Sequence, residues 1–246
     1  MPERKARRWI SLGGGTLLAI ILVAAGVREI AKEPCFQLVG DLTCRVDTAT
    51  KVVALTFDDG PTEMGVDAVL PVLARYDAKA TFFLVGNAAE RKPALVRRLL
   101  ESGHEVGNHS YSHVRNVGRP AEFYRTEVEA ANSVLQEAGA NVVLFRPPYG
   151  TKLWGLPRAV EAAGLRTVTW DVEEDYDEKD PARYAAHILE QVRPGSIILI
   201  HPMFSANETA RAALPTILSG LREKGYAVLT VSDLLDSAAA EKAGRQ

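Results

Sequence analysis

The strongest constraint on the fold is a regular alternation of short apolar runs with longer amphipathic segments beyond residue 50. Short apolar runs bounded by turn residues are typical of buried strands, and apolar residues repeating every three to four positions are typical of helices. We predict strands at 52–57, 80–85, 105–108, 142–146, 167–172, 196–200 and 227–231. We predict helices between them at 64–76, 88–101, 121–137, 154–163, 181–191 and 207–223.

Strands that alternate with helices form a parallel sheet, in which each helix returns the chain to the start of the next strand. Seven such strands, without a Gly-x-Gly-x-x-Gly turn, favour a barrel over a dinucleotide-binding fold. In α/β barrels the functional residues gather where strands end and loops begin. Polar side chains follow five of the predicted strands: Asp58 and Asp59, His109 and His113, Arg146, Asp171 and Glu173, and His201. The sequence therefore predicts one polar site at this end of the barrel.

Two of these groups have the pattern of a metal site. His109 and His113 are four residues apart, so a turn of helix would place both imidazoles on one face. With one carboxylate they would form a two-histidine, one-carboxylate site with open positions. Asp58 and Asp59 follow a neighbouring strand, and one of them can bind the metal while the other acts as a base. A cation at this place also reduces the repulsion between the two carboxylates.

Four short blocks occur in order along the chain: TFDDGP at 56–61, HSYSH at 109–113, RPPYG at 146–150 and LIH at 199–201. Together they resemble the conserved blocks of polysaccharide deacetylases with a NodB homology domain, which form carbohydrate esterase family four. The resemblance extends over about residues 50–235. It implies a distorted (β/α)7 barrel of the NodB type, and a metal-dependent hydrolase that removes N-acetyl groups from a polysaccharide.

The resemblance implies roles for the first three blocks. Asp59, His109 and His113 would be the ligands of Zn²⁺ or of another divalent transition metal. Asp58 would be the general base that takes a proton from the attacking water. Arg146 would pair with Asp58, orient it and keep it ionised.

The resemblance also implies the groups that would contact the substrate. The backbone N–H of Tyr149 would stabilise the oxyanion, together with the metal. His201 would protonate the leaving amine, a role suited to an imidazole. Leu199, two residues earlier on the same strand face, would line a pocket for the acetyl methyl group. Tyr176 would form part of the groove wall, where the family usually has a tryptophan.

The stretch TWDVEEDYD, residues 169–177, departs from the family pattern. The family usually has an aspartate here that supports the catalytic histidine. Asp171 and Glu173 alternate onto the same face of the predicted strand, so either can support His201.

The N-terminus has the composition of a membrane-targeting segment. Basic residues within 1–9 precede an uncharged, largely apolar stretch at 10–27, which Arg28 ends. Its 18 residues are near the lower limit for a helix that spans a bilayer. The basic flank would stay in the cytoplasm, so the rest of the chain would be extracytoplasmic. We expect either an uncleaved transmembrane anchor or a secretory signal peptide cleaved near 24–26.

The sequence thus divides into a basic stub with a hydrophobic helix at 1–28, a linker at 29–49 and a deacetylase domain at 50–240. The linker contains Cys35 and Cys44, which can form a disulfide in an exported protein. A formal net charge of −2 gives no electrostatic basis for binding nucleic acid. The expected partners are a polysaccharide and, through the apolar stretch, a membrane.

The leading hypothesis is deacetylation of peptidoglycan or another N-acetylglucosamine polymer outside the cytoplasm. A first alternative is hydrolysis of O-acetyl esters or of a different amide by the same site. A second is a glycan-binding module on a deacetylase fold that has lost its activity. Loss of a metal ligand or of the base would favour the second alternative, but all of these residues are present.

Overall fold

The structure, a computed structural model, describes residues 22, 26, 30, 33–152 and 154–245. The expected anchor or signal peptide at 10–27 lies outside these residues except for Leu22 and Gly26. None of the helices in the described part of the chain is long and apolar enough to cross a membrane.

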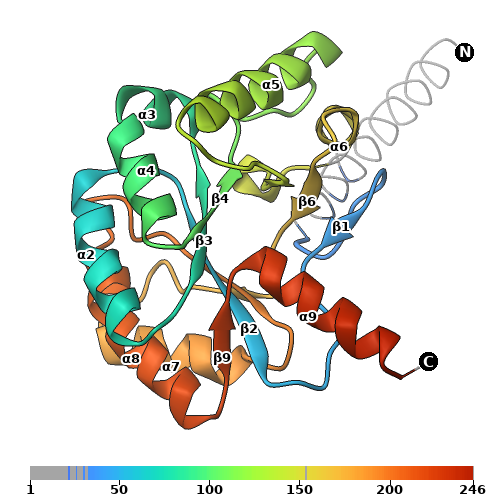
Figure 1. Ribbon diagram of the computed structural model, residues 1–246. Coiled ribbons are helices and arrows are strands. Elements are labelled where there is room, and N and C mark those ends of the chain that lie inside the picture. Colours follow the sequence, from blue (N-terminus) through green and yellow to red (C-terminus); the bar gives the residue numbers. More distant parts are fainter. Residues whose placement is uncertain (1–21, 23–25, 27–29, 31–32, 153, 246) are drawn as a thin grey trace, which may run out of the picture.

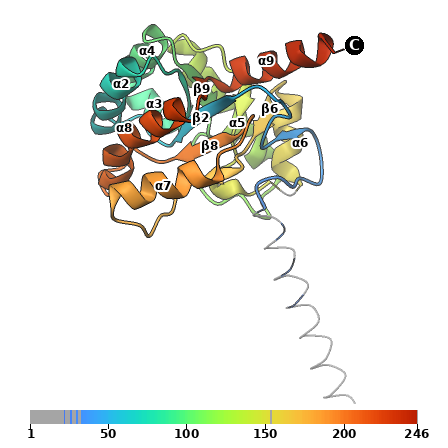
Figure 2. The same cartoon turned by 90° about the horizontal axis from the view of Figure 1, so that it is seen from below.

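The centre of the fold is a curled parallel sheet with helices around its outer face (Figures 1 and 2). Its strands follow the order β1-β6-β5-β4-β3-β2-β8-β7, and β9 pairs with the beginning of β2. All registered strand pairs are parallel. The strands are β1 (Leu42–Thr43), β2 (Val52–Asp58), β3 (Ala80–Leu84), β4 (Glu105–Asn108), β5 (Leu144–Phe145), β6 (Arg166–Val168), β7 (Val172–Glu173), β8 (Ile197–Ile200) and β9 (Ala227–Leu229).

The helices connect successive strands, so the predicted distorted α/β barrel is confirmed, with the sheet open between β7 and the β1–β6 edge. The helices are α2 (Glu63–Arg75), α3 (Gly86–Arg91), α4 (Pro93–Glu101), α5 (Ala121–Glu137), α6 (Gly155–Ala162), α7 (Pro181–Gln191), α8 (Glu208–Glu223) and α9 (Val231–Ala243), with a short 3₁₀ helix, η1, at Pro148–Gly150.

Several predicted elements differ from the structure. The single strand predicted at 167–172 is two strands: β6 lies next to the edge strand β1, and β7 forms the opposite edge of the sheet. Between them, Thr169 N donates to Thr43 O on β1, and Asp171 N donates to Ile197 O on β8. The helix predicted at 88–101 is two helices, because Pro93 begins α4. Strand β1 and helix α9 were not predicted.

Strand β2 is buried at every residue, and its two faces have different roles. Val53, Leu55 and Phe57 pack into the main apolar cluster that includes helix α2. Burial of each such side chain stabilises the fold by about 1.5–3 kcal/mol. Thr56 and Asp58 alternate onto the opposite face, which lies inside the curled sheet. The strand therefore anchors the fold on one side and presents polar groups on the other.

The linker is attached to the sheet ahead of β2. Cys35 and Cys44 form a disulfide, as the sequence allowed. Leu42 and Thr43, immediately before Cys44, form β1 and pair with β6. The part of the linker around β1 therefore lies along the open edge of the sheet, and Val46 N then donates to Gly195 O before β8.

Candidate active site

Strand β2 ends in an ion pair that is almost completely buried. The Asp58 side chain is 3% exposed and that of Arg146 is 0% exposed. Arg146 Nη1 donates to Asp58 Oδ1 and to Thr56 Oγ1, both at 2.7 Å. Burial alone would raise the pKa of Asp58, but the charge of Arg146 and its hydrogen bond to Asp58, together with the neighbouring imidazole of His201, outweigh burial and lower its pKa. Asp58 is therefore held as a carboxylate with a fixed orientation.

Arg146 is itself held by main-chain and aromatic groups. Its Nη2 donates to Thr169 O at 2.9 Å and its Nε to Val168 O at 3.4 Å. The guanidinium lies 4.1 Å from the centre of the Phe83 ring. Val168 is the last residue of β6 and Thr169 follows it, so the chain supplies these acceptors where it leaves β6.

The structure brings Asp59, His109 and His113 together as a candidate metal site, with one potential ligand atom of each within 4.8 Å of the others. Asp59 Oδ1 lies 3.3 Å from His113 Nε2 and 3.9 Å from His109 Nε2. His109 Nδ1 is 2.8 Å from Arg146 O, so a proton on Nδ1 donates to this carbonyl and leaves Nε2 as the free ligand atom. Asp59 Oδ1 is buried and lacks a hydrogen-bond partner among the described residues.

The segment that carries the two histidines is a loop, and not the helical turn that their spacing suggested. Ser110 N donates to Asn108 Oδ1 at 2.7 Å. Ser112 N and Oγ donate to the carboxylate of Glu127 on α5, at 2.9 and 2.7 Å. These side-chain hydrogen bonds replace those of a helix and fix the loop.

Backbone strain is concentrated at the same place. Four of the five described non-glycine residues with positive φ lie here: Asp59 with φ 74°, Ser110 with 63°, His113 with 54° and Tyr149 with 56°. L-residues in this region cost on the order of 1–3 kcal/mol each, and they persist only where the surrounding structure enforces the conformation. Three of the four are residues to which the sequence assigned a role.

His201 follows β8, and the carboxylate beside it is Glu174, not Asp171 or Glu173 as predicted. His201 Nδ1 lies 2.5 Å from Glu174 Oε1, which also accepts from His201 N at 3.1 Å. The other oxygen of Glu174 accepts from the hydroxyl of Tyr184. His201 Nε2 is left facing the site, 4.0 Å from Asp59 Oδ2.

This contact sets the proton affinity of His201. Burial alone would lower its pKa, but the hydrogen bond that it donates to Glu174 and the charges of Asp58, Glu174 and Asp59 raise it to about 9. His201 is therefore protonated at neutral pH and can serve as a proton donor.

The two carboxylates predicted to support His201 have other partners. Asp171 accepts from Ser196 Oγ at 3.0 Å and from Ile197 N at 2.9 Å. Glu173 accepts from the hydroxyl of Tyr176 at 2.9 Å. Strand β7 ends at Glu173, so the alternation on which the prediction relied does not continue to the next residue.

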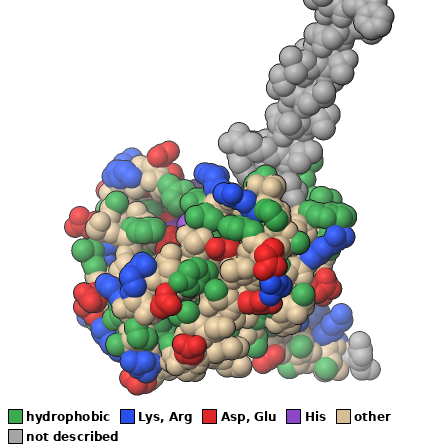
Figure 3. Space-filling model, turned by 90° about the horizontal axis from the view of Figure 1, so that it is seen from above, with side chains coloured by type: hydrophobic (Ala, Val, Ile, Leu, Met, Phe, Trp, Pro, Cys, Tyr) green, Lys and Arg blue, Asp and Glu red, His purple; other side chains and the backbone are tan. Residues whose placement is uncertain are grey.

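The remaining predicted site residues lie around this centre. The half-exposed ring of Tyr149 lies 4.8 Å from the His113 ring. The ring of Tyr176 lies 5.6 Å from that of His201. Leu199 is buried in β8, opposite Thr56 of β2. Viewed from above, a histidine side chain is visible in a narrow gap between other side chains (Figure 3).

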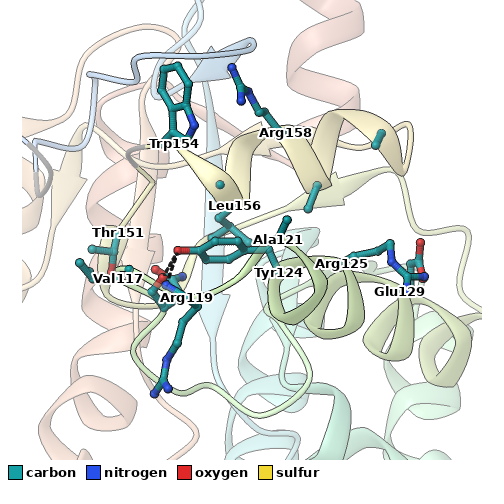
Figure 4. Close-up of a pocket in the computed structure, with 15 residues that line it drawn as sticks. Val117, Arg119, Ala121, Tyr124, Arg125, Glu129, Thr151, Trp154, Leu156 and Arg158 are labelled. Atoms are coloured by element: carbon teal, nitrogen blue, oxygen red, sulfur yellow. Dashed lines mark hydrogen bonds and ion pairs between the residues drawn. The ribbon is translucent and has the colours of Figure 1, made fainter.

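A cavity of about 530 Å³ lies beside this centre, between α5 and α6 (Figure 4). Thr151, two residues after Tyr149, is part of its lining. Tyr124 lies at its centre, with its hydroxyl donating to Asn116 O at 2.5 Å. The Trp154 ring is 56% exposed at the cavity. An apolar, aromatic surface thus lies next to the polar centre.

Comparison with known proteins gives a consistent result. Residues 45–168 match the family described as polysaccharide deacetylase. Over 199 residues the chain is 33% identical to a peptidoglycan-N-acetylglucosamine deacetylase of Bacillus cereus, and the alignment covers 80% of this chain and 93% of that enzyme.

Solved structures have the same fold. A crystal structure of a peptidoglycan N-acetylglucosamine deacetylase superposes with a TM-score of 0.74 and 31% identity, covering 78% of this chain and 92% of that one. A pseudoenzyme of the CE4 family from Bacillus anthracis superposes equally well, with a TM-score of 0.74 and 27% identity, covering 80% of this chain and 70% of that one. The fold alone therefore does not distinguish active from inactive relatives.

Proposed function

Because the chain belongs to the polysaccharide deacetylase family, whose members hydrolyse carbon–nitrogen amide bonds, we propose that it removes N-acetyl groups from the N-acetylglucosamine residues of peptidoglycan or a related polymer. We propose further that the reaction requires a divalent metal, zinc in the first instance, and takes place outside the cytoplasm.

One observation carries this proposal: a buried carboxylate, Asp58, and an imidazole bound to a second carboxylate, His201, flank the same candidate metal site. Carboxylate oxygens of Asp58 and Asp59 lie 3.7 and 3.9 Å from His109 Nε2. His201 Nε2 approaches from a third strand, 4.0 Å from Asp59 Oδ2. This arrangement supports Asp58 as the base, His201 as the acid and Asp59, His109 and His113 as the metal ligands.

The residues fit a metal ion. Asp59 Oδ1 is a buried carboxylate oxygen without a hydrogen-bond partner among the described residues, which is costly unless a cation compensates it. Two imidazole nitrogens and one carboxylate oxygen are a donor set suited to zinc. When bound, a divalent cation would polarise an acetyl carbonyl and lower the pKa of water to about 7.

The chain's own residues would then handle the protons and the charge. Asp58, kept ionised by Arg146, takes the proton of the attacking water. The N–H of Tyr149 donates to the carbonyl oxygen as negative charge develops on it. His201, protonated and oriented by Glu174, delivers a proton to the leaving nitrogen. Leu199 contributes an apolar wall for the methyl group of the acetyl.

A polymer substrate is supported by the cavity next to the Tyr149 loop, which offers space for a neighbouring sugar. The cavity lined by Thr151 and Trp154 is adjacent to the loop that contains Tyr149. An exposed indole face can pack against the apolar face of a neighbouring sugar ring.

The proposed function is tested by measuring acetate release from peptidoglycan and N-acetylglucosamine oligomers with the purified protein and zinc. Asp58→Asn is expected to lower turnover by about 10²-fold or more while binding the same amount of metal, because only the base is removed. Asp67→Asn, at an exposed carboxylate on α2, is the matched control and should behave as wild type. Full turnover in Asp58→Asn would exclude Asp58 as the base.

If wild type bound glycan without releasing acetate from any of these polymers, the protein would be a binding module and the proposed deacetylation would be wrong. Acetate release from O-acetylated but not N-acetylated glycans would favour an esterase. The proposed location is tested separately by cell fractionation and by accessibility of the protein to protease added outside the cell.

A further inference from the structure

Lys152 is a buried lysine in the loop that follows Tyr149. It is 1% exposed, and its Nζ atom donates to Gly150 O at 3.0 Å and to Glu33 O at 2.8 Å. Burying an ammonium group is costly, and neutral carbonyls offset this only in part. The pKa of Lys152 is accordingly lowered to about 8, mainly by burial. A charged group kept in such a place fixes two stretches of chain relative to each other.

One of these stretches is the loop that presents the Tyr149 N–H. Gly150 and Thr151 close η1, with Gly150 N donating to Pro147 O and Thr151 N to Pro148 O, each at 3.1 Å. Tyr149 has a positive φ of 56°, which this turn must enforce. The Lys152 ammonium binds the carbonyl of the residue next to Tyr149. It therefore acts on the conformation of the loop and does not itself reach the reacting atoms.

The other stretch is the linker, which is also connected to the proposed base, Asp58, through a chain of hydrogen bonds. Pro34 O, next to Glu33, accepts from Thr169 Oγ1 at 2.7 Å. Thr169 O in turn accepts from Arg146 Nη2 at 2.9 Å, and Arg146 binds Asp58. Two adjacent linker residues are thus connected to the two sides of the catalytic centre, one through Lys152 and one through Thr169.

The disulfide holds this part of the linker in place. Cys35 directly follows Pro34 and is bonded to Cys44, which directly follows β1. Strand β1 pairs with β6, and Thr169 N donates to Thr43 O at 2.9 Å. The segment Glu33–Cys44 is therefore closed at both ends against the same edge of the sheet.

We propose that Lys152 is a positioning residue for the Tyr149 loop, and that the disulfide-closed linker Glu33–Cys44 is the support to which Lys152 attaches this loop. The inference rests on the proposed deacetylase function, but it concerns a part of the chain outside the four motif blocks. According to this inference, the linker supports the active-site loop, and turnover depends on the Cys35–Cys44 disulfide.

The test uses the full-length protein with zinc and an N-acetylglucosamine oligomer. Lys152→Met keeps the length of the side chain and removes the charge. It is expected to lower kcat about tenfold or more, with KM changed less than about twofold, because small misplacement of a catalytic group slows the chemical step. Lys152→Arg, which can still donate to both carbonyls, should recover much of kcat. Lys79→Met is the matched control, because Lys79 also donates to a carbonyl, that of Ser102, in a different part of the fold.

A second measurement does not depend on activity. Amide hydrogen exchange at 149–151 is expected to become faster in Lys152→Met and in Cys35→Ser/Cys44→Ser, and to stay unchanged in Lys79→Met. Reduction with a phosphine should lower kcat of wild type and leave that of the double serine variant unchanged. Because exchange is read without substrate, a failure of the deacetylase proposal and a failure of this inference give different results.

The inference is overturned if Lys152→Met exchanges and turns over as wild type does, or if only its KM changes. If this variant does not fold, the reduction experiment decides: unchanged kcat and unchanged exchange at 149–151 in the reduced protein exclude a supporting role of the linker.

Discussion

At the scale of single residues, Asp58 and Asp59 are neighbours in sequence with different surroundings. Asp58 ends β2 facing the interior and is bound to Arg146, while Asp59 leaves the strand with φ 74°. The positive φ turns the second carboxylate toward His113, so the two acids do not compete for one partner. The sequence predicted two distinct roles for this pair, and the geometry is consistent with that division.

Glu174 gives the clearest prediction at this scale. Its hydrogen bond raises the pKa of His201, so Glu174→Gln should lower that pKa. His201 would lose its proton at lower pH, and the alkaline limb of the kcat/KM profile should move to lower pH by about one unit or more. The measurement is the pH profile of acetate release by both proteins at equal metal content.

Asp171→Asn is the control for Glu174→Gln. Asp171 was the sequence-based candidate for the same role but binds Ser196 and Ile197. The alkaline limb of the kcat/KM profile of Asp171→Asn should lie at the same pH as that of wild type. A shift in Asp171→Asn with none in Glu174→Gln would reverse the assignment made from the structure.

The sequence indicated the region that supplies the carboxylate for His201, but it did not identify Glu174 as the residue. Three acidic residues, Asp171, Glu173 and Glu174, lie within four positions. Strand alternation selected the first two, because a continuous strand was assumed through 172. The chain instead leaves β7 after Glu173, and a prediction based on alternation cannot locate the end of a two-residue strand.

His104 makes the stability of the fold depend on pH. Its Nδ1 accepts from Ala80 N at 3.3 Å, and burial, aided by the charge of Lys79, lowers its pKa from 6.5 to about 4. As the pH falls below 6.5, His104 becomes protonated in the unfolded chain, but in the folded chain it stays neutral until about pH 4. The free energy of unfolding therefore falls between pH 6.5 and pH 4. With allowance for solvent screening we expect a loss on the order of 2 kcal/mol. Urea unfolding of His104→Gln should show a smaller loss than wild type, and an equal loss would contradict the assignment.

At the scale of secondary structure elements, the long periodic segments were predictable and the short ones were not. Helices α5 and α7 have the predicted bounds, and β4 does as well. Strands β1 and β7 have two residues each, too few for a periodic pattern to be recognised. Their positions depend on contacts with distant chain, such as the pairing of β1 with β6, which sequence patterns do not contain.

The turn before β8 depends on a glycine. Gly195 has φ +80°, and a Cβ added to it would lie 1.9 Å from Val46 O. Gly195→Ala should destabilise the protein by about 3 kcal/mol or more, because the backbone on both sides must move. Gly164→Ala is the control: Gly164 has φ +71° but no atom within 4 Å of the added Cβ, so only the backbone cost of about 1 kcal/mol should remain. Urea denaturation of both variants measures the difference, and equal losses would show that the contact with Val46 is unimportant.

At the scale of the whole molecule, the candidate active site lies where strands from different parts of the sheet meet. Asp59 follows β2, His109 follows β4 and His201 follows β8. Because the strands are parallel, their carboxyl ends lie on the same side of the sheet. The sequence could therefore predict that these residues come together. The position of the linker could not be predicted in this way, because the hydrogen bonds that hold it, from Lys152 to Glu33 O and from Thr169 to Pro34 O, join residues more than a hundred positions apart.

This arrangement predicts that a metal stabilises the whole fold. An ion held by Asp59, His109 and His113 joins the ends of β2 and β4, and the unfolded chain has no such preformed site. Zinc at 100 times its Kd should add about 2.7 kcal/mol to the free energy of unfolding. In a chain of this length that corresponds to a rise in Tm of about 5–10 °C. Thermal unfolding with zinc and with a chelator should show this rise in wild type and in Asp58→Asn, and should not show it in His113→Gln. An equal rise in His113→Gln would mean that zinc binds elsewhere, and no rise in wild type would remove the metal from the proposed mechanism.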